Sequence, residues 1–392
     1  MSAIIAGYAR TPFVKSNGQF ATIPATVLGG HAGRAALANA GVDPADVDIV
    51  IAGQVLQAGA GQNPARQSAV AAGIPLGTPA ITLNAVCLSG MEAVVQAVRL
   101  IASGEAQVVL AIGQESMSLA PHAWVGSRAG KKFGAVELVD TLEYDGLTDA
   151  FERRSMGLST DEYNESFQVD RARQDAFAAS SHARLAAAIE GKIFADEIVA
   201  VEVAARGGAI SVSVDDGLRA DTTAESLGKL RGSFREGGSI TAGNASQISD
   251  GAAALVIVSA EWAQTHGIAG IVRVVSHAFV SGPDVSLHAQ PSNAILAAAA
   301  KAGVAPAEFA AVEINEAFAA VAVHSTAALG VDAAIVNSHG GAIALGHPIG
   351  ASGARIVGHL ALRLAAQGTG ARGAAGICGG GGQGSAVILE AV

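Results

Sequence analysis

The sequence predicts an α/β fold made of two similar halves, with a long polar insertion in the first half. AGVDPADVDIVIAG at 40–53 resembles AGVAPAEFAAVEIN at 302–315, and VRLIASG at 98–104 resembles LRLAAQG at 362–368. The copies occur in the same order and at nearly equal spacing, which indicates an internal repeat. The second pair continues into strands of small apolar residues, AQVVLAIG and ARGAAGICG, as expected of α/β units.

The insertion separates the two copies. Residues 115–265 hold 37 of the 58 charged residues of the chain, so we expect this segment to lie over the apolar α/β body. Long excursions of this kind usually bind or cover a ligand. We therefore expect a first half at 1–265, with a loop region that binds or covers a ligand inserted at about 115–250, and a second half at 266–392.

Composition excludes several classes of protein. With 392 residues, 50% hydrophobic and 15% charged, the chain is expected to fold around a large core rather than to be disordered. A net charge of −10 argues against a nucleic-acid scaffold. Neither a signal peptide nor an apolar run of membrane-spanning length is apparent, and only two cysteines are present. We expect a cytoplasmic protein without disulfides and without a membrane segment.

The first cysteine, Cys87, follows the apolar run AITLNAV and precedes apolar residues at helical spacing. Ser89 and Glu92 have the spacing of a capping box, so the pattern predicts a buried strand, a turn with Cys87, and a helix that begins near Ser89. The positive end of that helix would lower the pKa of the thiol and make it reactive. A structural, buried cysteine is an equally good interpretation.

The second cysteine opens the glycine run CGGGGQG near the C-terminus. A dinucleotide-binding fingerprint needs a helix and a further strand after the glycines, and only eight residues follow Gly384. The pattern predicts instead two strands joined by a glycine loop whose backbone lies close to a ligand. In the repeat, Cys378 takes the place of Gln114. It is either a small buried hydrophobe or a thiol that faces a cavity.

A histidine lies in the segment GGAIALGHPIGAS, which the second half has in addition to the first. The helix after His347 is expected to begin near Ser352. If the halves pack about a pseudo-twofold axis, the loop after IVNSH at 335–339 faces the loop after TLNAV at 82–86, which places His347 near Cys87. A cysteine as nucleophile and a histidine as base are the smallest set of side chains that thioester chemistry needs. His339 is the nearest rival.

The chain resembles the thiolase family along its whole length. The similarity rests on NAVCLSG around Cys87, INEAFA around Asn315, GGAIALGHPIGASGAR around His347 and CGGGGQG at Cys378. RTPF, GQNPARQ and TAGNASQISDGAAA agree as well. The resemblance implies duplicated α/β halves layered α/β/α/β/α, with a loop domain inserted in the first half.

The resemblance also implies catalytic roles. Cys87 would accept the acyl group, His347 would activate it, and Cys378 would move the α-proton of a second acetyl-CoA. Asn315 would hold a water that faces the thioester oxygen together with His347. The N–H groups of Cys87 and Gly380 would form the other oxyanion site. No metal and no cofactor is implied, because coenzyme A thioesters are the substrates.

Further residues match the positions that line the coenzyme A site in the family. Ser246 would contact the pantetheine arm, and Met156 and Phe318 would line its tunnel. Arg219 and Ser226 would lie beside the nucleotide end, and Leu147 is a further expected contact of the substrate or coenzyme A. Arg219 would serve equally well as a solvated partner of the neighbouring acids. Two departures from the common family pattern, Ser155 and Leu88, bear on the acyl-chain preference.

The implied reaction is the acetyl-CoA C-acetyltransferase reaction, the reversible Claisen condensation of two acetyl-CoA to acetoacetyl-CoA and CoA, within fatty acid and lipid metabolism. One alternative is a 3-ketoacyl-CoA thiolase that acts on longer chains. An alternative of another class is a non-catalytic acyl-CoA or lipid-binding protein. Because family members are dimers or tetramers, we expect a homo-oligomer, such as a homotetramer, and no nucleic-acid partner.

Overall fold

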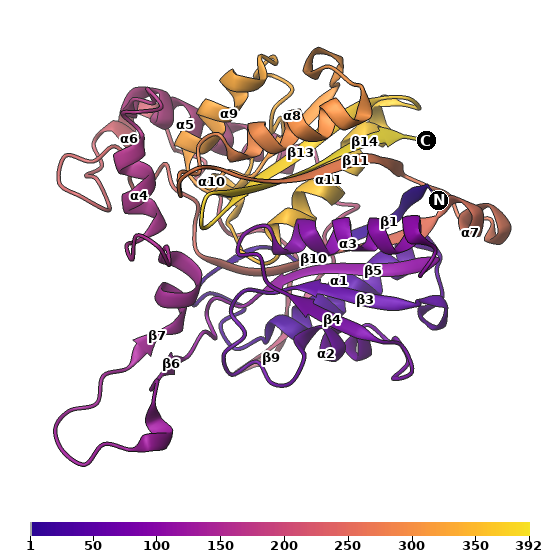
Figure 1. The fold of residues 1–392 in the computed structure, drawn as a ribbon, viewed down its shortest axis with the longest axis horizontal. Helices are drawn as coiled ribbons and strands as arrows, with labels where there is room; N and C mark the ends of the chain where they lie inside the picture. The colour runs from indigo at the N-terminus through magenta and orange to yellow at the C-terminus, as the bar shows by residue number, and fades with distance from the viewer. Residues whose placement is uncertain (1) are drawn as a thin grey trace.

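Residues 2–392, which the computed structural model describes, form three layers of helices around one ten-stranded β-sheet, whose two parts we call the first and the second sheet, and two further two-stranded sheets lie in the insertion (Figure 1). The first sheet has the order β4-β3-β5-β10-β1, and the second has the order β12-β13-β14-β11. The two are joined where Ile4 and Ile5 of β1 pair with Arg273 and Val272 of β11. The first-sheet strands are β1 (Ala3–Arg10), β3 (Ile49–Gly53), β4 (Ala80–Leu83), β5 (Val108–Glu115) and β10 (Ser249–Ser259), with β2 (Val14–Lys15) beside β10. The second-sheet strands are β11 (Val272–Ser281), β12 (Ala311–Ile314), β13 (Arg372–Gly379) and β14 (Gln383–Ala391).

The strand pairing confirms the predicted duplication. β3 is parallel to β4 and β5, and β12 is parallel to β13 and to a bridge at Val336. β10 and β14 then follow as antiparallel neighbours of β5 and β13. The repeated sequences lie at the ends of corresponding helices: the first pair follows α1 (Ala25–Ala40) and α8 (Gln290–Ala302), and the second ends α3 (Ser89–Ser103) and α11 (Ser352–Gln367).

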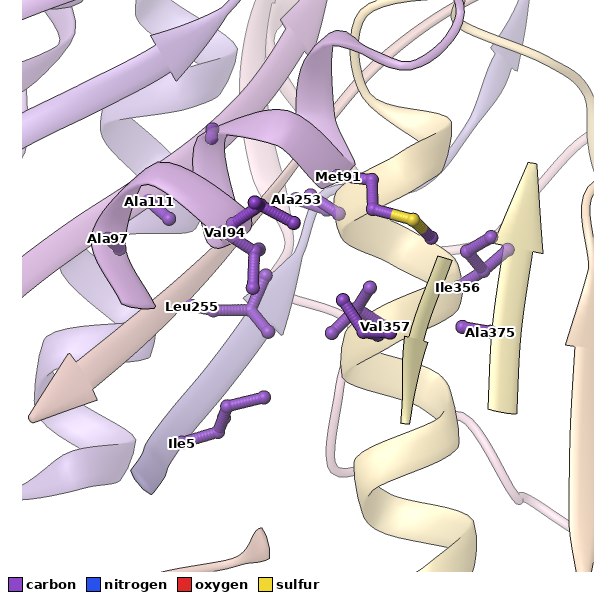
Figure 2. Close-up of a cluster of buried hydrophobic side chains, with 14 of the residues drawn as sticks. Ile5, Met91, Val94, Ala97, Ala111, Ala253, Leu255, Ile356, Val357 and Ala375 are labelled. Atoms are coloured by element: carbon purple, nitrogen blue, oxygen red, sulfur yellow. The ribbon is translucent and has the colours of Figure 1, made fainter. Parts of the chain in front are cut away.

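The central layer consists of α3 and α11, which lie between the two sheets (Figure 1). Their apolar side chains, among them Met91 and Val357, form a core with Leu255 of the first sheet and Ala375 of the second (Figure 2). The helices approach closely at Gly353 because glycine has no side chain: a Cβ there would lie 2.4 Å from the Met91 nitrogen. The outer layers are α1 and α2 (Pro64–Ala71) on the first sheet and α8 and α9 (Ala319–Leu329) on the second (Figure 1).

Several local predictions are corrected by the structure. β4 is an edge strand, with Ile81 54% exposed, and not a buried strand. Ser89 is the first residue of α3 rather than its cap, and no capping box forms, because the Glu92 carboxylate accepts from the Ser385 hydroxyl at 2.6 Å. By length and hydropathy alone, Val86–Ser103 could span a membrane, contrary to the expectation; 61% of it is buried between the sheets, as in a core helix.

The chain leaves the first sheet after Glu115 and returns to it at Ser249. The segment between them includes an extended hairpin that projects from the body and a group of helices that lies beside α9 and α10 (Figure 1). Its elements are β6 (His122–Ala123), β7 (Val139–Asp140), a π-helix (Leu142–Leu147), α4 (Met156–Tyr163), α5 (Arg171–Glu190), β8 (Val201–Ala205), β9 (Gly208–Val212) and α6 (Ala224–Gly228). The short helices α7 (Ala260–His266) and α10 (Ala342–Leu345) belong to the remainder of the chain.

Candidate active site

Cys87 lies on the turn between β4 and α3, as predicted. The residue before it, Val86, has φ +53°, a left-handed conformation that a β-branched residue rarely adopts. The Ser89 side chain stabilises the turn, because its Oγ donates to the Val86 carbonyl at 2.6 Å and accepts from the Ala85 N–H at 2.9 Å. Strain of this kind is typical of functional sites and persists only where the surroundings enforce it.

The environment of Cys87 contradicts the expectation of a low pKa. The side chain is buried, and burial raises the pKa of the thiol to about 12 although the N–H groups of Cys87 and Gly380 hydrogen-bond to the sulfur and lower it. The nearby Glu115 carboxylate raises it further. The positive end of α3 is therefore outweighed by desolvation, and Cys87 rests as a thiol.

His347 lies in the loop between α10 and α11, and α11 begins at Ser352 as predicted. Its Nδ1 is 2.6 Å from Ser352 Oγ, and that hydroxyl donates to the Pro348 carbonyl at 3.1 Å. The network therefore assigns the ring proton to Nδ1 and leaves Nε2 as the acceptor nitrogen. Burial lowers the pKa of His347 to about 3, so the imidazole is neutral and able to act as a base.

Asn315 follows β12 directly, and its side chain contacts His347. Its Nδ2 is 3.5 Å from His347 Nε2, and its backbone N–H donates to the Gly376 carbonyl at 3.0 Å. Within residues 2–392, its Oδ1 has no hydrogen-bond partner although it is buried. A buried amide oxygen of this kind is suited to hold a water molecule. The rival His339 instead contacts His359 Nε2 at 3.0 Å, in a separate polar cluster.

Cys378 is the seventh residue of β13, as Gln114 is the seventh residue of β5, so the repeat places it as predicted. The side chain is 1% exposed. Burial raises the pKa of the Cys378 thiol above its ordinary range, and the nearby Cys87 raises it further. Cys378 is therefore a protonated thiol close to Cys87.

The glycine loop after Cys378 brings backbone to the site, as predicted. β13 and β14 form the antiparallel hairpin, and Gly381 and Gly382 have φ +79° and +72°. A Cβ on Gly380 would lie 3.1 Å from Met156 Sδ, so a side chain there would meet the wall of the site. Glycine at this position allows the Gly380 N–H to reach Cys87.

One cavity of about 500 Å³ brings most of the predicted residues together. Its wall includes both cysteines and the histidine together with five of the predicted coenzyme A contacts: Cys87, Cys378, His347, Leu147, Met156, Arg219, Ser246 and Phe318. The wall is mostly apolar, which suits a pantetheine arm and a short acyl group. Nucleophile, base and second thiol therefore face one space.

Three predicted residues lie outside this wall. Asn315 contacts His347 without lining the cavity, and Gly380 lines a neighbouring groove with Val86 and Met156. Ser226 is exposed on α6, where its Oγ and the Thr223 side chain form a capping box. The departure at Leu88 also lies outside, because Leu88 is fully buried beneath β13 and a Cβ on Gly379 would be 2.7 Å from it.

Several wall residues were not expected from the sequence. Phe234 packs edge-to-face on Phe318 with ring centroids 6.3 Å apart, and Leu287 packs against Cys378. The sequence holds one signal for Phe234: the residue after Met156 is glycine, and a Cβ there would lie 2.1 Å from the Phe234 ring. No local pattern marks Leu287. Within residues 2–392, no group of His, Cys, Asp and Glu has the arrangement of a metal site.

Comparisons with known proteins agree with this geometry. Family models described as "Thiolase, N-terminal domain" and "Thiolase, C-terminal domain" match residues 3–261 and 268–391. The chain is 50% identical to a "Probable acetyl-CoA acetyltransferase" of Mycobacterium leprae, over 100% of this chain and 99% of that protein. It is 45% identical to an "Acetyl-CoA acetyltransferase" of Pseudomonas aeruginosa, over 98% of both chains. The crystal structure of human mitochondrial 3-ketoacyl-CoA thiolase superposes with a TM-score of 0.94 at 36% identity, covering 100% of this chain and 99% of that one.

Proposed function

The chain belongs to the thiolase family, and from this premise we propose that it is an acetyl-CoA C-acetyltransferase, which interconverts two acetyl-CoA with acetoacetyl-CoA and CoA. The observation that carries the proposal is that Cys87, His347 and Cys378 line one cavity while two backbone N–H groups point at the Cys87 sulfur. An acyl group transferred to a cysteine remains a reactive thioester, and a second thiol can exchange a proton with the carbanion.

In the cleavage direction, the Cys87 sulfur attacks the C3 carbonyl of acetoacetyl-CoA as His347 Nε2 takes the thiol proton. Because the pKa of Cys87 is about 12 and that of His347 about 3, the charged pair is not populated at rest, and proton transfer accompanies bond formation. The N–H groups of Cys87 and Gly380, which hydrogen-bond to the sulfur at rest, then donate to the developing oxyanion. Donors of this kind contribute about 3–4 kcal/mol.

The C2–C3 bond then breaks, and its electron pair leaves with C2 as the enolate of acetyl-CoA. Cys378 protonates C2, a role that fits a buried thiol held in its protonated form. The enolate oxygen faces His347 and a water held by Asn315 Oδ1, an oxygen otherwise without a partner in residues 2–392. The thiol of CoA then attacks acetyl-Cys87 and gives its proton to the Cys378 thiolate, while His347 returns a proton to Cys87.

The coenzyme A arm would enter along Ser246, Phe318, Met156 and Leu147 and reach the surface at Arg219. Ser226, exposed on α6, is available to the nucleotide end at the surface. Coenzyme A thioesters are the only small molecules that the proposed chemistry requires, without a metal or cofactor. A cytoplasmic location remains part of the proposal.

The proposal includes a homo-oligomer, either a dimer or a tetramer. The hairpin that contains β6 and β7 projects from the body (Figure 1), and its exposed apolar side chains include Phe133 at 94% and Val125 at 75%. The strand β4 lies at the edge of the sheet and exposes Ile81. Exposed apolar patches and open strand edges usually mark contacts between chains.

A thiolysis series tests the proposed function. The purified protein would be given CoA and 3-ketoacyl-CoA substrates of four to ten carbons, with Cys87→Ala as the inactive control. We expect the highest kcat/KM for acetoacetyl-CoA. A higher value for eight carbons or more would instead favour the 3-ketoacyl-CoA thiolase of longer chains, and no thiolysis of any substrate would favour a non-catalytic acyl-CoA-binding protein.

A further inference from the structure

The mechanism leaves one buried acid beside the site unused. Glu115 is the last residue of β5 and is fully buried. Its Oε2 accepts from the N–H groups of Val55 and Gly350, each at 3.0 Å, and its Oε1 accepts from Leu56 N–H at 3.2 Å. Val55 and Leu56 belong to the first half and Gly350 to the second, so this carboxylate joins the two halves.

On one side, a series of hydrogen bonds leads from Glu115 toward the nucleophile. The Val55 carbonyl accepts from Asn84 Nδ2 at 3.4 Å, and Asn84 Oδ1 accepts from Val86 N–H at 2.9 Å. Val86 is the strained residue that directly precedes Cys87. The hydrogen bonds from Glu115 through Asn84 therefore help to hold the conformation that aims Cys87 into the cavity.

On the other side, Glu115 fixes the loop that carries the base. Gly350 lies three residues after His347, and a Cβ on it would be 2.5 Å from the Gln114 carbonyl and 2.8 Å from Glu115 Oε2. Only glycine can approach so closely. In α10, directly before this loop, the N–H of Ile343 donates to Glu316, a second buried carboxylate, at 3.1 Å. His347 thus lies on a segment that is anchored at both ends.

We propose that Glu115 is a positioning residue that sets the loop of His347 relative to the loop of Cys87. The inference rests on the proposed function, for which these two side chains must meet at one carbonyl carbon. A carboxylate is required because three N–H donors converge on two acceptor oxygens. A glutamine amide would turn an NH₂ group toward at least one N–H, so one of the two loops must move.

The test compares Glu115→Gln with Asp48→Asn in the full-length protein. Asp48 is a matched control: its carboxylate accepts from the N–H groups of Gln107 and Val108 at 2.7 and 2.9 Å, at the opposite end of β5. For acetoacetyl-CoA thiolysis, we expect kcat of Glu115→Gln to fall about 10–100-fold with KM within about 3-fold, as a displacement near 1 Å would cause. A kcat equal to that of the control, measured below both melting temperatures, would overturn the proposal.

A second variant keeps the proposal testable if Glu115→Gln does not fold. Asn84→Asp retains the acceptor for Val86 N–H and removes the donor to Val55, so it breaks the same path at an exposed position. We expect slower thiolysis and a changed rate of Cys87 alkylation by iodoacetamide; wild-type values for both would contradict the inference. If the wild-type protein proves inactive, the proposed function fails, and the alkylation rates still decide whether Glu115 and Asn84 position Cys87.

Discussion

The His347 imidazole donates through Nδ1 to the Ser352 hydroxyl, 2.6 Å away, and Ser352 in turn donates to the Pro348 carbonyl. Ser352 is the first residue of α11, so the helix that fills the central layer also orients the base. A single hydroxyl therefore determines which ring nitrogen faces the substrate.

Replacing Ser352 by alanine should impair catalysis more than folding. Without the Oγ acceptor, His347 can carry its proton on Nε2, the wrong nitrogen for a base, and we expect kcat to fall about 10-fold or more as general-base catalysis weakens. Ser292→Ala is the control, because its Oγ makes a similar bond to the Ala289 carbonyl at 2.9 Å without a histidine. Equal thiolysis rates for the two variants would contradict the assigned tautomer.

Alkylation of the two cysteines should follow the corrected pKa values. Because burial raises the pKa of Cys87 to about 12, its rate of reaction with iodoacetamide should keep rising with pH to the alkaline limit of stability rather than level off near neutrality. Cys87 should still react before Cys378, whose pKa burial raises further. Peptide mass spectrometry over pH 6–10 measures both; a plateau near pH 7 would instead support the original expectation.

The repeat made much of the fold predictable. It located corresponding helices and strands, and through them it placed Cys378 at the position of Gln114 and His347 near Cys87. The glycine hairpin was predictable because SAVILEAV after the glycine run has the pattern of a strand and not of the helix that a dinucleotide-binding fingerprint needs. Such predictions succeed where the local pattern leaves few alternatives.

Other features were not predictable, because they depend on contacts between distant segments. The position of Cys87 before a helix suggested a low pKa, but burial in a cluster that includes Ile349 of the second half and Met117 of the insertion raises it. Ser89 and Glu92 had capping spacing, yet Ser385 of β14 takes the Glu92 carboxylate. The role of Glu115 likewise depends on Gly350, which lies far along the chain.

Stability should decline in mild acid because of buried histidines. Burial lowers the pKa of both His288 and His347 to about 3 from 6.5, so their contribution is fully present above pH 6.5 and is lost as the pH falls toward 3. Glu115 acts in the opposite direction: burial raises its pKa to about 7 from 4.5, so its contribution is lost as the pH rises through that range.

His288 allows this dependence to be measured outside the catalytic set. For His288→Asn, the slope of unfolding free energy against pH between 4.5 and 6.5 should be smaller by up to about 1.4 kcal/mol per pH unit. Urea denaturation at several pH values gives the slope, and His122→Asn, on the exposed hairpin, is the control. An unchanged slope for His288→Asn would show that this residue is not held neutral by the fold.

The projecting hairpin should govern assembly rather than folding. Phe133→Asp places a charge on a side chain that is 94% exposed in the single chain, so the melting temperature of the protomer core should change little. If the hairpin contacts another copy, the variant should form smaller oligomers by light scattering than the wild type. Identical masses for the two proteins would exclude Phe133 from the contact, and a monomeric wild type would contradict the proposed homo-oligomer.

The two cysteines should separate the two half-reactions. Cys87 carries the acetyl group, so Cys87→Ala should lose both acetylation and condensation. Cys378 is essential only for the carbanion, because a CoA thiolate can leave acetyl-CoA without receiving a proton, so Cys378→Ala should still accept an acetyl group from acetyl-CoA onto Cys87, visible as a mass addition on the Cys87 peptide. Condensation to acetoacetyl-CoA should fall by at least the ~10²–10⁴-fold expected for a missing acid–base group.

Serine at position 378 tests the chemistry at nearly constant shape. Cys378→Ser should remain as inactive in condensation as Cys378→Ala, because a hydroxyl is far less acidic than a thiol and cannot exchange a proton with C2. The side chain is 1% exposed and packs against Leu287 and Val321, so a purely structural cysteine would give the opposite pattern. In that case both variants would lose melting temperature yet condense acetyl-CoA at nearly the wild-type rate, and the acid–base role of Cys378 would be wrong.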